Sequence, residues 1–448
     1  MTSTAVLAVH GTAYHAPTAD ELEVLEQVTI AVDATGTIVA VHPSGSPDAA
    51  RVTEAAQTVE RLSPAQRLLP GLVDLHIHAP QWPQLGTGLD LPLEEWLFRH
   101  TFPLEARYAD ERFAASVWEH MVPTLLASGT TTAVYYSSIH ERATELLAEQ
   151  CFRSGQRAFV GRVGMDHPEG TPDWYRDSSA GDGVAASARS VEAVRRIAGD
   201  QLLVQPIVTP RFVPACTDEM LRGLGDLAAA TGVRVQTHCS ESDWQHGESL
   251  ARYGRSDAAA LDAFGLIRPS NVLAHGDLLG DDDLTLIAAR DAGVAHCPLS
   301  NAYFGNAVFP ARHALARGVK VGLGTDIAGG AHPGLLPQCA MAVTASRMLE
   351  DGVDPRRSPG ERGRPGSRID ITTAFHLATT GGAAVLGIRV GSFRVGQQFD
   401  AFVVDVAASN IGLRRWDDVD SEQRLFEKIV RLAGPSDITA VWVAGRRV

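Results

Sequence analysis

The stretch PGLVDLHIHAPQW, residues 70–82, contains an apolar run that ends in two histidines one residue apart, His76 and His78. The run predicts a buried β-strand, and side chains at positions i and i+2 of a strand point to the same side. Two imidazoles fixed on one rigid strand form half of a preorganised zinc site. The pair alone fits a buried strand without a metal equally well, so its meaning depends on the later strands.

Eight short apolar runs follow one another through the middle of the chain, separated by amphipathic segments rich in Ala, Leu and Arg. The predicted strands are GLVDLHIH (71–78), TTTAVYY (130–136), RAFVGRVG (157–164), LLVQPIVTP (202–210), VRVQTHCS (233–240), NVLAHG (271–276), VAHCP (294–298) and VKVGLGTD (319–326). Eight strand–helix repeats over roughly 300 residues predict an α/β fold, a (β/α)8 TIM-like barrel. A doubly wound open sheet is the alternative, although the segment contains no GxGxxG or Walker loop.

The two ends of the chain are also rich in predicted strands. Residues 4–16 alternate in part, and residues 29–43 form two β-rich runs around the turn sequence ATGT, which is typical of a hairpin. Residues 391–407 and 438–448 are predicted strands with glycine-containing turns. Two β-rich ends therefore flank the predicted barrel, and residues 356–368, rich in Arg, Gly and Pro, predict a surface loop.

The composition excludes several classes of protein. The net charge of −14 argues against a broad nucleic-acid surface, which would be basic. No run approaches about 18 apolar residues, so we expect no membrane span. The first residues lack the basic and apolar regions of a signal peptide. The five cysteines are scattered, without a CxxC pair, which favours a reduced, cytoplasmic setting.

Ionisable residues stand at the ends of three further predicted strands. His238 ends the fifth strand, with Glu241 three residues later, and His275 ends the sixth. Asp326 ends the eighth strand, before a glycine-rich turn. A barrel brings the carboxyl ends of its strands together around one mouth, where the active sites of such barrels lie. We therefore expect these side chains to meet the histidine pair of the first strand.

Four of these residues would ligate a divalent metal: His76, His78, His238 and Asp326. Zn²⁺ is the first choice for three nitrogens and one oxygen, and Fe²⁺ is a competitor. Binuclear sites of this kind need a bridging lysine or glutamate on the fourth strand, and residues 202–210 contain neither, so we predict one metal ion. The ion would lower the pKa of a bound water towards about 7.

The remaining two residues suit proton transfer and polarisation. Glu241, one turn beyond His238, is better placed to shuttle protons than to ligate the metal. His275 would hydrogen-bond the attacking water or polarise the substrate. The predicted reaction is therefore hydrolytic, with addition of water to an electrophilic carbon followed by loss of a leaving group.

Together the motifs resemble the amidohydrolase superfamily over nearly the whole chain, through PGLVDLHIH, THCSE, AHG and GTD. Within it, the chain is similar to the guanine deaminase family through LDLPLEEWLFRHTFPLEARY, SGTTTAVYYSSIH, GQRAFVGRVGMD, IVTPRFVPAC, GVAHCPLSN and VGLGTDIAGG. The resemblance implies a barrel of residues 69–388 and a small β-sandwich domain built from residues 1–68 and 389–448. It also implies zinc-dependent conversion of guanine to xanthine and ammonia in purine catabolism, and a homodimer.

The resemblance further implies roles for individual residues. Arg211 would face the O6/N7 acceptor edge of guanine, Phe212 would lie against the flat ring, and Gln81 would bind the purine through its amide. Glu241 would donate a proton to the ring N3 during attack on C2, and Asp326 would accept the proton of the water. The implied sets are, for catalysis, Glu241, His275 and Asp326; for substrate binding, Gln81, Arg211, Phe212, His238, Glu241 and Asp326; for the metal, His76, His78, His238 and Asp326.

The chain departs from related deaminases at two places. Cys239 stands where they carry an apolar residue, and we predict that it is inert packing. Trp82 and Pro83 lie in the loop expected to cover the substrate, where relatives carry a tyrosine. The departure at Trp82 and Pro83 affects the expected fine substrate specificity and not the expected reaction class.

Two other functions stay open on the sequence. One is a related aminohydrolase or chlorohydrolase that acts on a pterin, 8-oxoguanine, an adenosine derivative or a triazine. The other is a non-catalytic barrel that binds a ligand. The presence of every predicted metal ligand and of Glu241 argues against the non-catalytic barrel.

Overall fold

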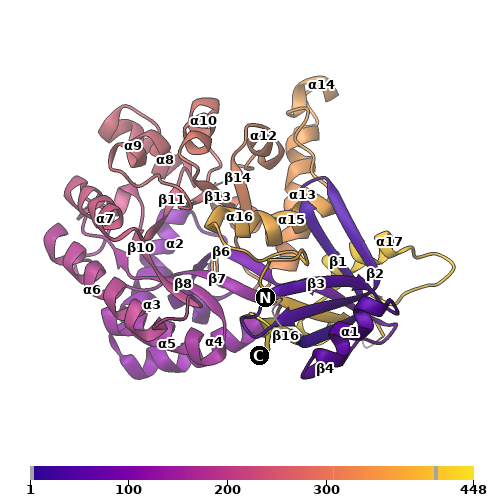
Figure 1. Ribbon diagram of the computed structural model, residues 1–448. Helices are drawn as coiled ribbons and strands as arrows, with labels where there is room; N and C mark the ends of the chain where they lie inside the picture. The colour runs from indigo at the N-terminus through magenta and orange to yellow at the C-terminus, as the bar shows by residue number, and fades with distance from the viewer. Residues whose placement is uncertain (1–4, 306, 408–411) are drawn as a thin grey trace.

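Eight parallel strands form the barrel and follow one another in chain order (Figure 1). The computed structural model describes residues 5–305, 307–407 and 412–448. The barrel strands are β6 (Leu72–His78), β7 (Thr130–Tyr136), β8 (Arg157–Gly161), β10 (Val204–Pro210), β11 (Arg234–Cys239), β12 (Val272–His275), β13 (Gly293–His296) and β14 (Lys320–Leu323). All eight predicted strands are confirmed. The sequential strand order excludes the doubly wound alternative, in which the order reverses at a switch point.

The barrel closes between its first strand and the segment that follows its last. The backbone N–H of His78 donates to the carbonyl of Ile327 at 2.8 Å, and the N–H of Asp326 donates to the carbonyl of His76 at 2.8 Å. A parallel bridge pairs Ile77 with Ile327. The HxH and GTD motifs, about 250 residues apart in the chain, therefore lie side by side as neighbouring strands would.

Helices follow the barrel strands and cover the outside of the barrel (Figure 1). The longer ones are α4 (Glu111–Ala127), α5 (Glu141–Ser154), α6 (Ala180–Ala198), α7 (Asp218–Thr231), α8 (Asp243–Tyr253), α10 (Asp281–Ala289) and α13 (Leu335–Asp351), and the shorter ones are α9 (Asp257–Ala263), α12 (Ala311–Ala316), α15 (Ile371–His376) and α16 (Gly382–Leu386). Asp110 and Thr217 cap α4 and α7 by accepting backbone N–H bonds. Gly155 and Gly232, with φ of 72° and 68°, end α5 and α7 in the left-handed region that glycine favours.

Short irregular helices replace a simple strand–helix turn at three places near the site. The first place, between β6 and α4, contains η1 (Ala79–Gln84), α2 (Leu93–Trp96), η2 (Leu97–Thr101), α3 (Phe102–Ala106) and η3 (Arg107–Ala109). The second is η4 (Val213–Ala215) after β10, and the third is α11 (Pro298–Ser300) with η5 (Asn301–Gly305) after β13. All three lie at the carboxyl ends of barrel strands, where a site can form.

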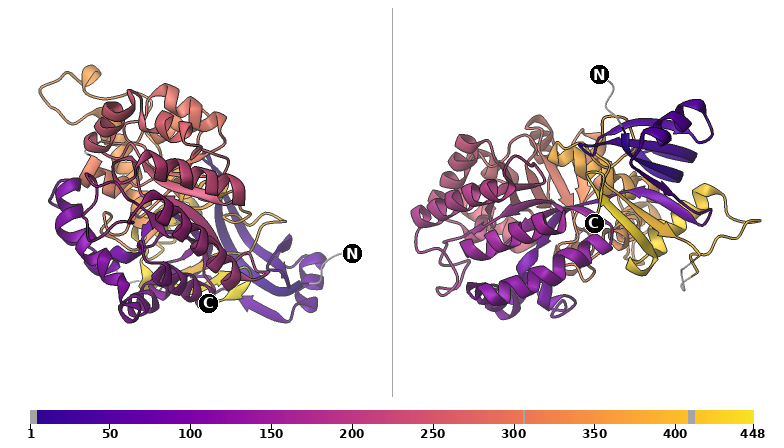
Figure 2. Two further views of the ribbon diagram at one scale, coloured as in Figure 1. Left: turned by 90° about the vertical axis from the view of Figure 1, so that its left-hand side faces the viewer. Right: turned by 60° about the horizontal axis from the view of Figure 1, so that its bottom comes forward.

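The strands from the two chain ends form a separate sheet beside the barrel (Figure 2). Its members are β1 (Ala5–Thr18), β2 (Glu21–Asp33), β3 (Ile38–Pro43), β4 (Thr58–Arg61), β5 (Gln66–Pro70), β15 (Ala401–Asp405), β16 (Ile438–Val443) and β17 (Arg446–Arg447). The antiparallel pairing of β5 with β15 joins the two ends of the chain. The separate β domain is confirmed, and its strands are connected in one eight-stranded sheet.

The predicted hairpin around the ATGT turn is confirmed, because β2 and β3 pair antiparallel on either side of it. Residue 4, the first of the predicted strand 4–16, lies outside the described residues. The predicted boundary between residues 68 and 69 falls inside β5, whose last residue, Pro70, still pairs with Ala401. The division into residues 1–68, 69–388 and 389–448 stays a prediction.

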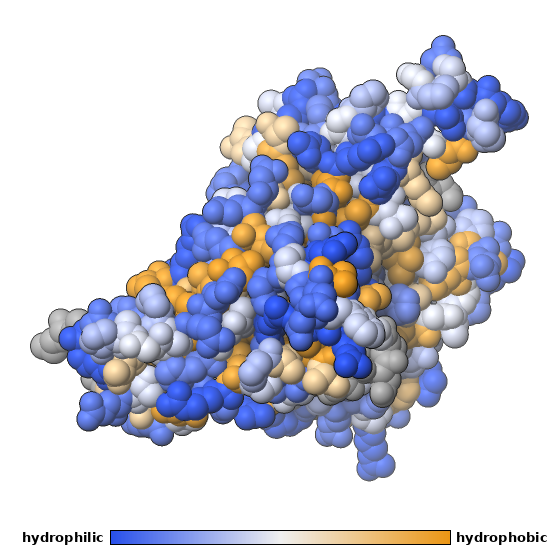
Figure 3. Space-filling model, turned by 90° about the vertical axis from the view of Figure 1, so that its right-hand side faces the viewer, coloured by the Kyte–Doolittle hydropathy of each residue, from blue (hydrophilic) through white to orange (hydrophobic). Residues whose placement is uncertain are grey.

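Residues 356–368 lie at the surface, as predicted, and contain the four-residue helix α14 (Pro359–Arg362) at the top of Figure 1. Figure 3 shows polar side chains over most of the face that carries the terminal sheet, with apolar side chains gathered in bands between them. Among the described residues, no helix combines the length and the apolar character that crossing a membrane requires.

Candidate metal centre and its cavity

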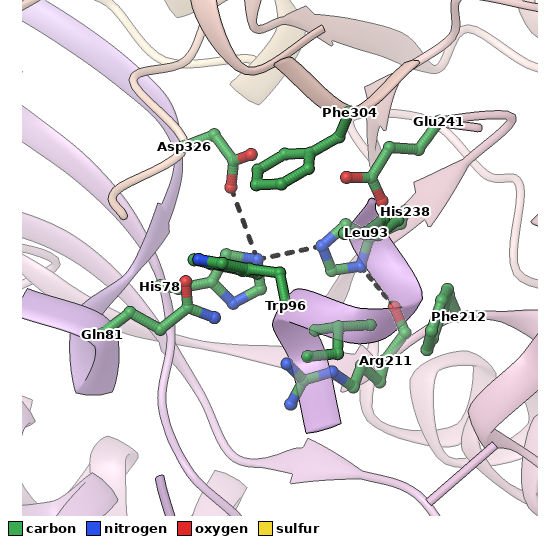
Figure 4. Close-up of a pocket in the computed structure, with 11 residues that line it drawn as sticks. His78, Gln81, Leu93, Trp96, Arg211, Phe212, His238, Glu241, Phe304 and Asp326 are labelled. Carbon is green, nitrogen blue, oxygen red and sulfur yellow. Dashed lines mark hydrogen bonds and ion pairs between the residues drawn. The ribbon is translucent and has the colours of Figure 1, made fainter. Parts of the chain in front are cut away.

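Three histidines and one aspartate meet at the carboxyl ends of the barrel strands. His76 and His78 end β6, His238 lies on β11, and Asp326 follows β14. The Nε2 atoms of His78 and His238 lie 2.9 Å apart. One oxygen of Asp326, Oδ1, lies 3.1 Å from Nε2 of His76 and 3.5 Å from Nε2 of His78. The structure therefore brings together all four residues predicted to ligate a metal, and Figure 4 shows three of them around one point.

The hydrogen bonds of these histidines fit a metal-binding role. Neither ring nitrogen of His76 makes a hydrogen bond, although the side chain is fully buried. Nδ1 of His238 lies 2.6 Å from the carbonyl oxygen of Arg211 and donates to it, which leaves Nε2 with its lone pair facing the cluster. Buried polar nitrogens without partners are rare in folded proteins. A divalent cation bound between these atoms would satisfy them.

The protonation of the cluster also suits a cation. Burial lowers the pKa of His76, His78 and His238 well below the ordinary histidine value, and the neighbouring imidazoles lower it further. These rings are therefore neutral at physiological pH, which is the form of imidazole that binds metals. The donor set of three neutral nitrogens and a carboxylate is one that zinc prefers.

Glu241 and His275 border the cluster on the side of β11 and β12. Nε2 of His275 lies 3.7 Å from Oε1 of Glu241 and 3.9 Å from Oδ2 of Asp326. Burial raises the pKa of Glu241 well above its ordinary value, and the nearby Asp326 raises it further. Burial also raises the pKa of Asp326, while His275 lowers it. The protonated form of Glu241 is therefore favoured, as a proton donor requires.

Two residues that we did not single out in the sequence orient His275. Asn301 donates through its side-chain nitrogen to Asp277, so its Oδ1 faces Nδ1 of His275, 2.9 Å away, and accepts the ring N–H. The other ring nitrogen, Nε2, is left with its lone pair towards the cluster. His275 and Asp326 have φ of 75° and 50°, a left-handed backbone region that is rare for side-chain-bearing residues and concentrated at functional sites.

A cavity adjoins the cluster (Figure 4), and its empty space of about 330 Å³ includes a part that is open to solvent. Its walls are formed by His78, Gln81, Leu93, Trp96, Leu97, Arg211, Phe212, His238, Glu241, Phe304 and Asp326. His76 and His275 are not among the lining residues. Six of the seven residues predicted to bind or convert a purine therefore share one cavity.

The predicted base-binding residues lie at the end of the cavity away from Glu241 and Asp326 (Figure 4). Arg211 is 2% exposed and forms two hydrogen bonds with Glu105, of 2.6 and 3.1 Å. Gln81 donates to Glu105 at 2.9 Å. Phe212, also 2% exposed, offers an apolar wall. We did not single out Glu105 in the sequence, although it belongs to the distinctive stretch TFPLEAR.

The structure corrects the prediction for Trp82. This side chain is half-buried and donates from Nε1 to Nδ1 of His120 on α4, at 3.0 Å, and it does not line the cavity. The physical reason is the turn of η1, which directs Gln81 inward and its neighbour outward. Trp96, from α2, lines the cavity instead. Cys239 is buried, and its pKa is raised by burial, in agreement with inert packing.

A parallel barrel with histidines and an aspartate at one mouth defines a class of metal-dependent hydrolases. The model of the amidohydrolase family matches residues 67–448, and the chain belongs to this family. Guanine deaminase of Mus musculus is 33% identical over 99% of this chain and 96% of its own length.

Two solved structures share the fold. Guanine deaminase from C. acetobutylicum, solved with guanine bound in the active site, superposes with a TM-score of 0.86 at 29% identity, covering 98% of this chain and 99% of that one. An adenosine deaminase from Xanthomonas campestris with bound zinc superposes with a TM-score of 0.82 at 26% identity, covering 100% of this chain and 93% of that one. The fold therefore carries deaminases of more than one substrate.

Proposed function

We propose that this protein hydrolyses guanine to xanthine and ammonia, in purine catabolism. The observation that carries the proposal is one cavity that holds Gln81, Arg211 and Phe212 at one end and Glu241 and Asp326 at the other. The residues at the first end suit a flat base with polar edges, and those at the second suit proton transfer. The similarity to guanine deaminases over nearly the whole chain supports the same substrate.

We propose further that one Zn²⁺ binds among His76, His78, His238 and Asp326. The buried, neutral imidazoles, and the lack of a hydrogen bond at either ring nitrogen of His76, support a cation there, and Fe²⁺ is the competing ion. When bound, such an ion supplies Lewis-acid activation of a water molecule. The zinc in the related adenosine deaminase supports the choice of metal.

The protein's own side chains would bind the base and move the protons. Arg211 and Gln81 would hold the O6/N7 edge of guanine, with Phe212 against the ring, so that C2 lies near the cluster. Glu241 would give its proton to N3, and Asp326 would take the proton of the water that attacks C2. His275 would hold the water in place through a hydrogen bond to its free Nε2, because this atom lies close to the carboxyl groups of both Glu241 and Asp326. The 2-amino group would take the proton held by Asp326 and leave as ammonia, while the hydroxyl at C2 would return a proton to Glu241 and become the 2-oxo group of xanthine.

The direct test is xanthine formation from guanine, followed by liquid chromatography, with and without a chelator. We expect turnover of guanine that the chelator abolishes. A parallel panel should contain 8-oxoguanine, a pterin, adenosine and a triazine, which represent the alternative heterocycles. If kcat/KM is larger for one of these compounds than for guanine, that compound and not guanine is the substrate. A protein that takes up no metal and turns over none of them would be the non-catalytic barrel.

We also propose a homodimer in the cytoplasm. All five cysteines are free and buried in the structure, which suits a reducing compartment. The homodimer rests on the family resemblance. Light scattering of the purified protein tests it, with a mass of two chains expected.

A further inference from the structure

The carboxylate of Glu105 collects four hydrogen bonds beside the base-binding end of the cavity. Oε1 accepts from Nε2 of Gln81 at 2.9 Å and from Nη2 of Arg211 at 3.1 Å. Oε2 accepts from Nη1 of Arg211 at 2.6 Å and from the hydroxyl of Tyr175 at 3.0 Å. The side chain is 1% exposed. A carboxylate has about four acceptor positions, so these donors saturate it.

This network decides which way the amide of Gln81 faces. Its nitrogen meets Glu105, which only accepts, and its oxygen accepts the backbone N–H of Ala328 at 3.1 Å, which only donates. Turning the amide over would place N–H against N–H and oxygen against carboxylate, so the network allows one orientation. Gln81 lines the cavity, and its nitrogen keeps one N–H for a ligand (Figure 4).

Arg211 is held in the same way. Two of its five N–H groups go to Glu105, and its guanidinium carbon lies 4.9 Å from the centre of the Phe102 ring. The ion pair offsets the charge of Arg211, so this end of the cavity is close to electroneutral. This end of the cavity presents hydrogen-bond donors to a ligand, namely the remaining N–H groups of Arg211 and Gln81. An acceptor edge on the ligand would match them, and an amino group there would oppose them.

We propose that Glu105 is a positioning residue that sets the polarity of the base-binding end and thereby the substrate class. By holding Gln81 and Arg211 with their donors inward, it makes the cavity select 2-amino purines that carry an oxygen at C6 over those that carry an amino group there. The inference rests on the proposed function and deepens it, because Glu105 lies outside the cavity wall and acts through two residues that form it.

The test is Glu105→Gln, assayed by ammonia release from guanine and from 2,6-diaminopurine, which has an amino group in place of the oxygen at C6. Glutamine keeps the shape but carries a donor, so it cannot accept all four bonds, and Gln81 becomes free to turn. We expect kcat/KM for guanine to fall about 10- to 100-fold, mainly through KM, with unchanged metal content. We expect the preference for guanine over 2,6-diaminopurine to fall at least about tenfold. The preference is the ratio of the two kcat/KM values, and comparing it between wild type and Glu105→Gln cancels the intrinsic reactivity of each ring.

Tyr175→Phe is the matched control, because Tyr175 donates to the same carboxylate but does not line the cavity. We expect its substrate ratio to stay within about threefold of wild type. An unchanged ratio in Glu105→Gln, or an equal change in Tyr175→Phe, would overturn the proposal. Absence of guanine turnover in the wild type would instead overturn the proposed function.

A measurement on the wild type covers the case in which Glu105→Gln does not fold. Hypoxanthine and adenine differ at C6, oxygen against amino, and neither carries the 2-amino group, so their inhibition constants report recognition alone. Hypoxanthine should inhibit at least about tenfold more tightly. Equal or tighter inhibition by adenine would contradict the proposed polarity.

Discussion

Glu241 is a carboxylic acid buried between the histidine cluster and the cavity, and it is 5% exposed. Burial first, and the nearby Asp326 second, raise its pKa well above the ordinary value. A carboxyl group that keeps its proton near neutral pH can give it to a ring nitrogen as water adds. Glu241 lies beside the proposed metal ligands, and we propose for it a role in proton transfer, so a substitution can separate proton transfer from metal binding.

Glu241→Gln should keep the metal and lose about 10²- to 10⁴-fold in kcat, because the amide keeps the shape but cannot transfer a proton. The measurements are elemental analysis and xanthine formation. Glu248→Gln, on α8 and outside the cavity wall, is the control and should behave as wild type. Loss of the metal in Glu241→Gln would make Glu241 a ligand, which would contradict its proposed role.

Sequence reasoning found the residues that end barrel strands and missed those that support them. His76, His238 and Asp326 could be predicted because a strand end in a barrel has a known direction. Glu105 could not, because it lies on α3, within an irregular segment where no periodic pattern indicates which side chains point inward. Asn301 lies on η5, a turn of the same irregular kind.

The contact between β6 and the segment after β14 holds the proposed metal ligands in register. Asp74, fully buried on β6, accepts from the backbone N–H of Thr325 at 3.0 Å and from its hydroxyl at 2.6 Å. The same carboxylate accepts from the backbone N–H of His76 at 3.2 Å. Asp74 therefore links the strand of two proposed ligands, His76 and His78, to the turn that carries Asp326. The sequence places Asp74 within VDLHIH, but its hydrogen bonds to Thr325 could be identified only in the closed barrel.

Asp74→Asn should weaken metal binding by about 10- to 100-fold, because the amide places a donor against the donors of Thr325 and loosens the ligand geometry. The free energy of unfolding should fall by about 1–3 kcal/mol. Competition with a chromogenic chelator and urea denaturation measure the two effects. Metal affinity equal to that of wild type would show that Asp74 does not position the ligands.

The terminal sheet and the barrel are joined by buried polar and aromatic contacts. Arg157, at the start of β8, donates twice to Asp400, at 3.0 Å each. On the other side, α17 (Glu422–Leu432) packs Phe426 against Phe375 of α15, with ring centres 5.3 Å apart. The terminal β domain could be predicted from strand patterns, but these contacts join residues far apart in sequence and could not. The first residue of α17, Glu422, also pairs with Arg67 of β5.

The pair of Glu422 with Arg67 should make stability depend on pH. Burial acts to raise the pKa of Glu422, but hydrogen bonds from Arg67 and Tyr14 outweigh it and lower the pKa from 4.5 to about 2. The carboxylate therefore stabilises the fold above pH 4.5, and this stabilisation is lost as the pH falls towards 2. Glu422→Gln should unfold about 1–3 kcal/mol more easily at pH 7.

Urea denaturation at pH 7, 4.5 and 3.5 tests this, with the difference between wild type and Glu422→Gln expected to shrink at the two lower pH values. Glu427→Gln, on the exposed side of the same helix, is the control. A difference that does not change with pH would show that the charge of Glu422 is not the source of the stabilisation.

The claim on which the proposed chemistry depends is that a single ion, held by His76, His78, His238 and Asp326, is required for hydrolysis of guanine. Its most direct test strips the protein with a chelator, removes the chelator, and follows xanthine formation while Zn²⁺ is added back in known amounts. The predicted result is no xanthine from the stripped protein and full recovery at one equivalent of Zn²⁺ per chain. Xanthine formation by the metal-free protein at the original rate, or recovery only at two equivalents, would contradict it.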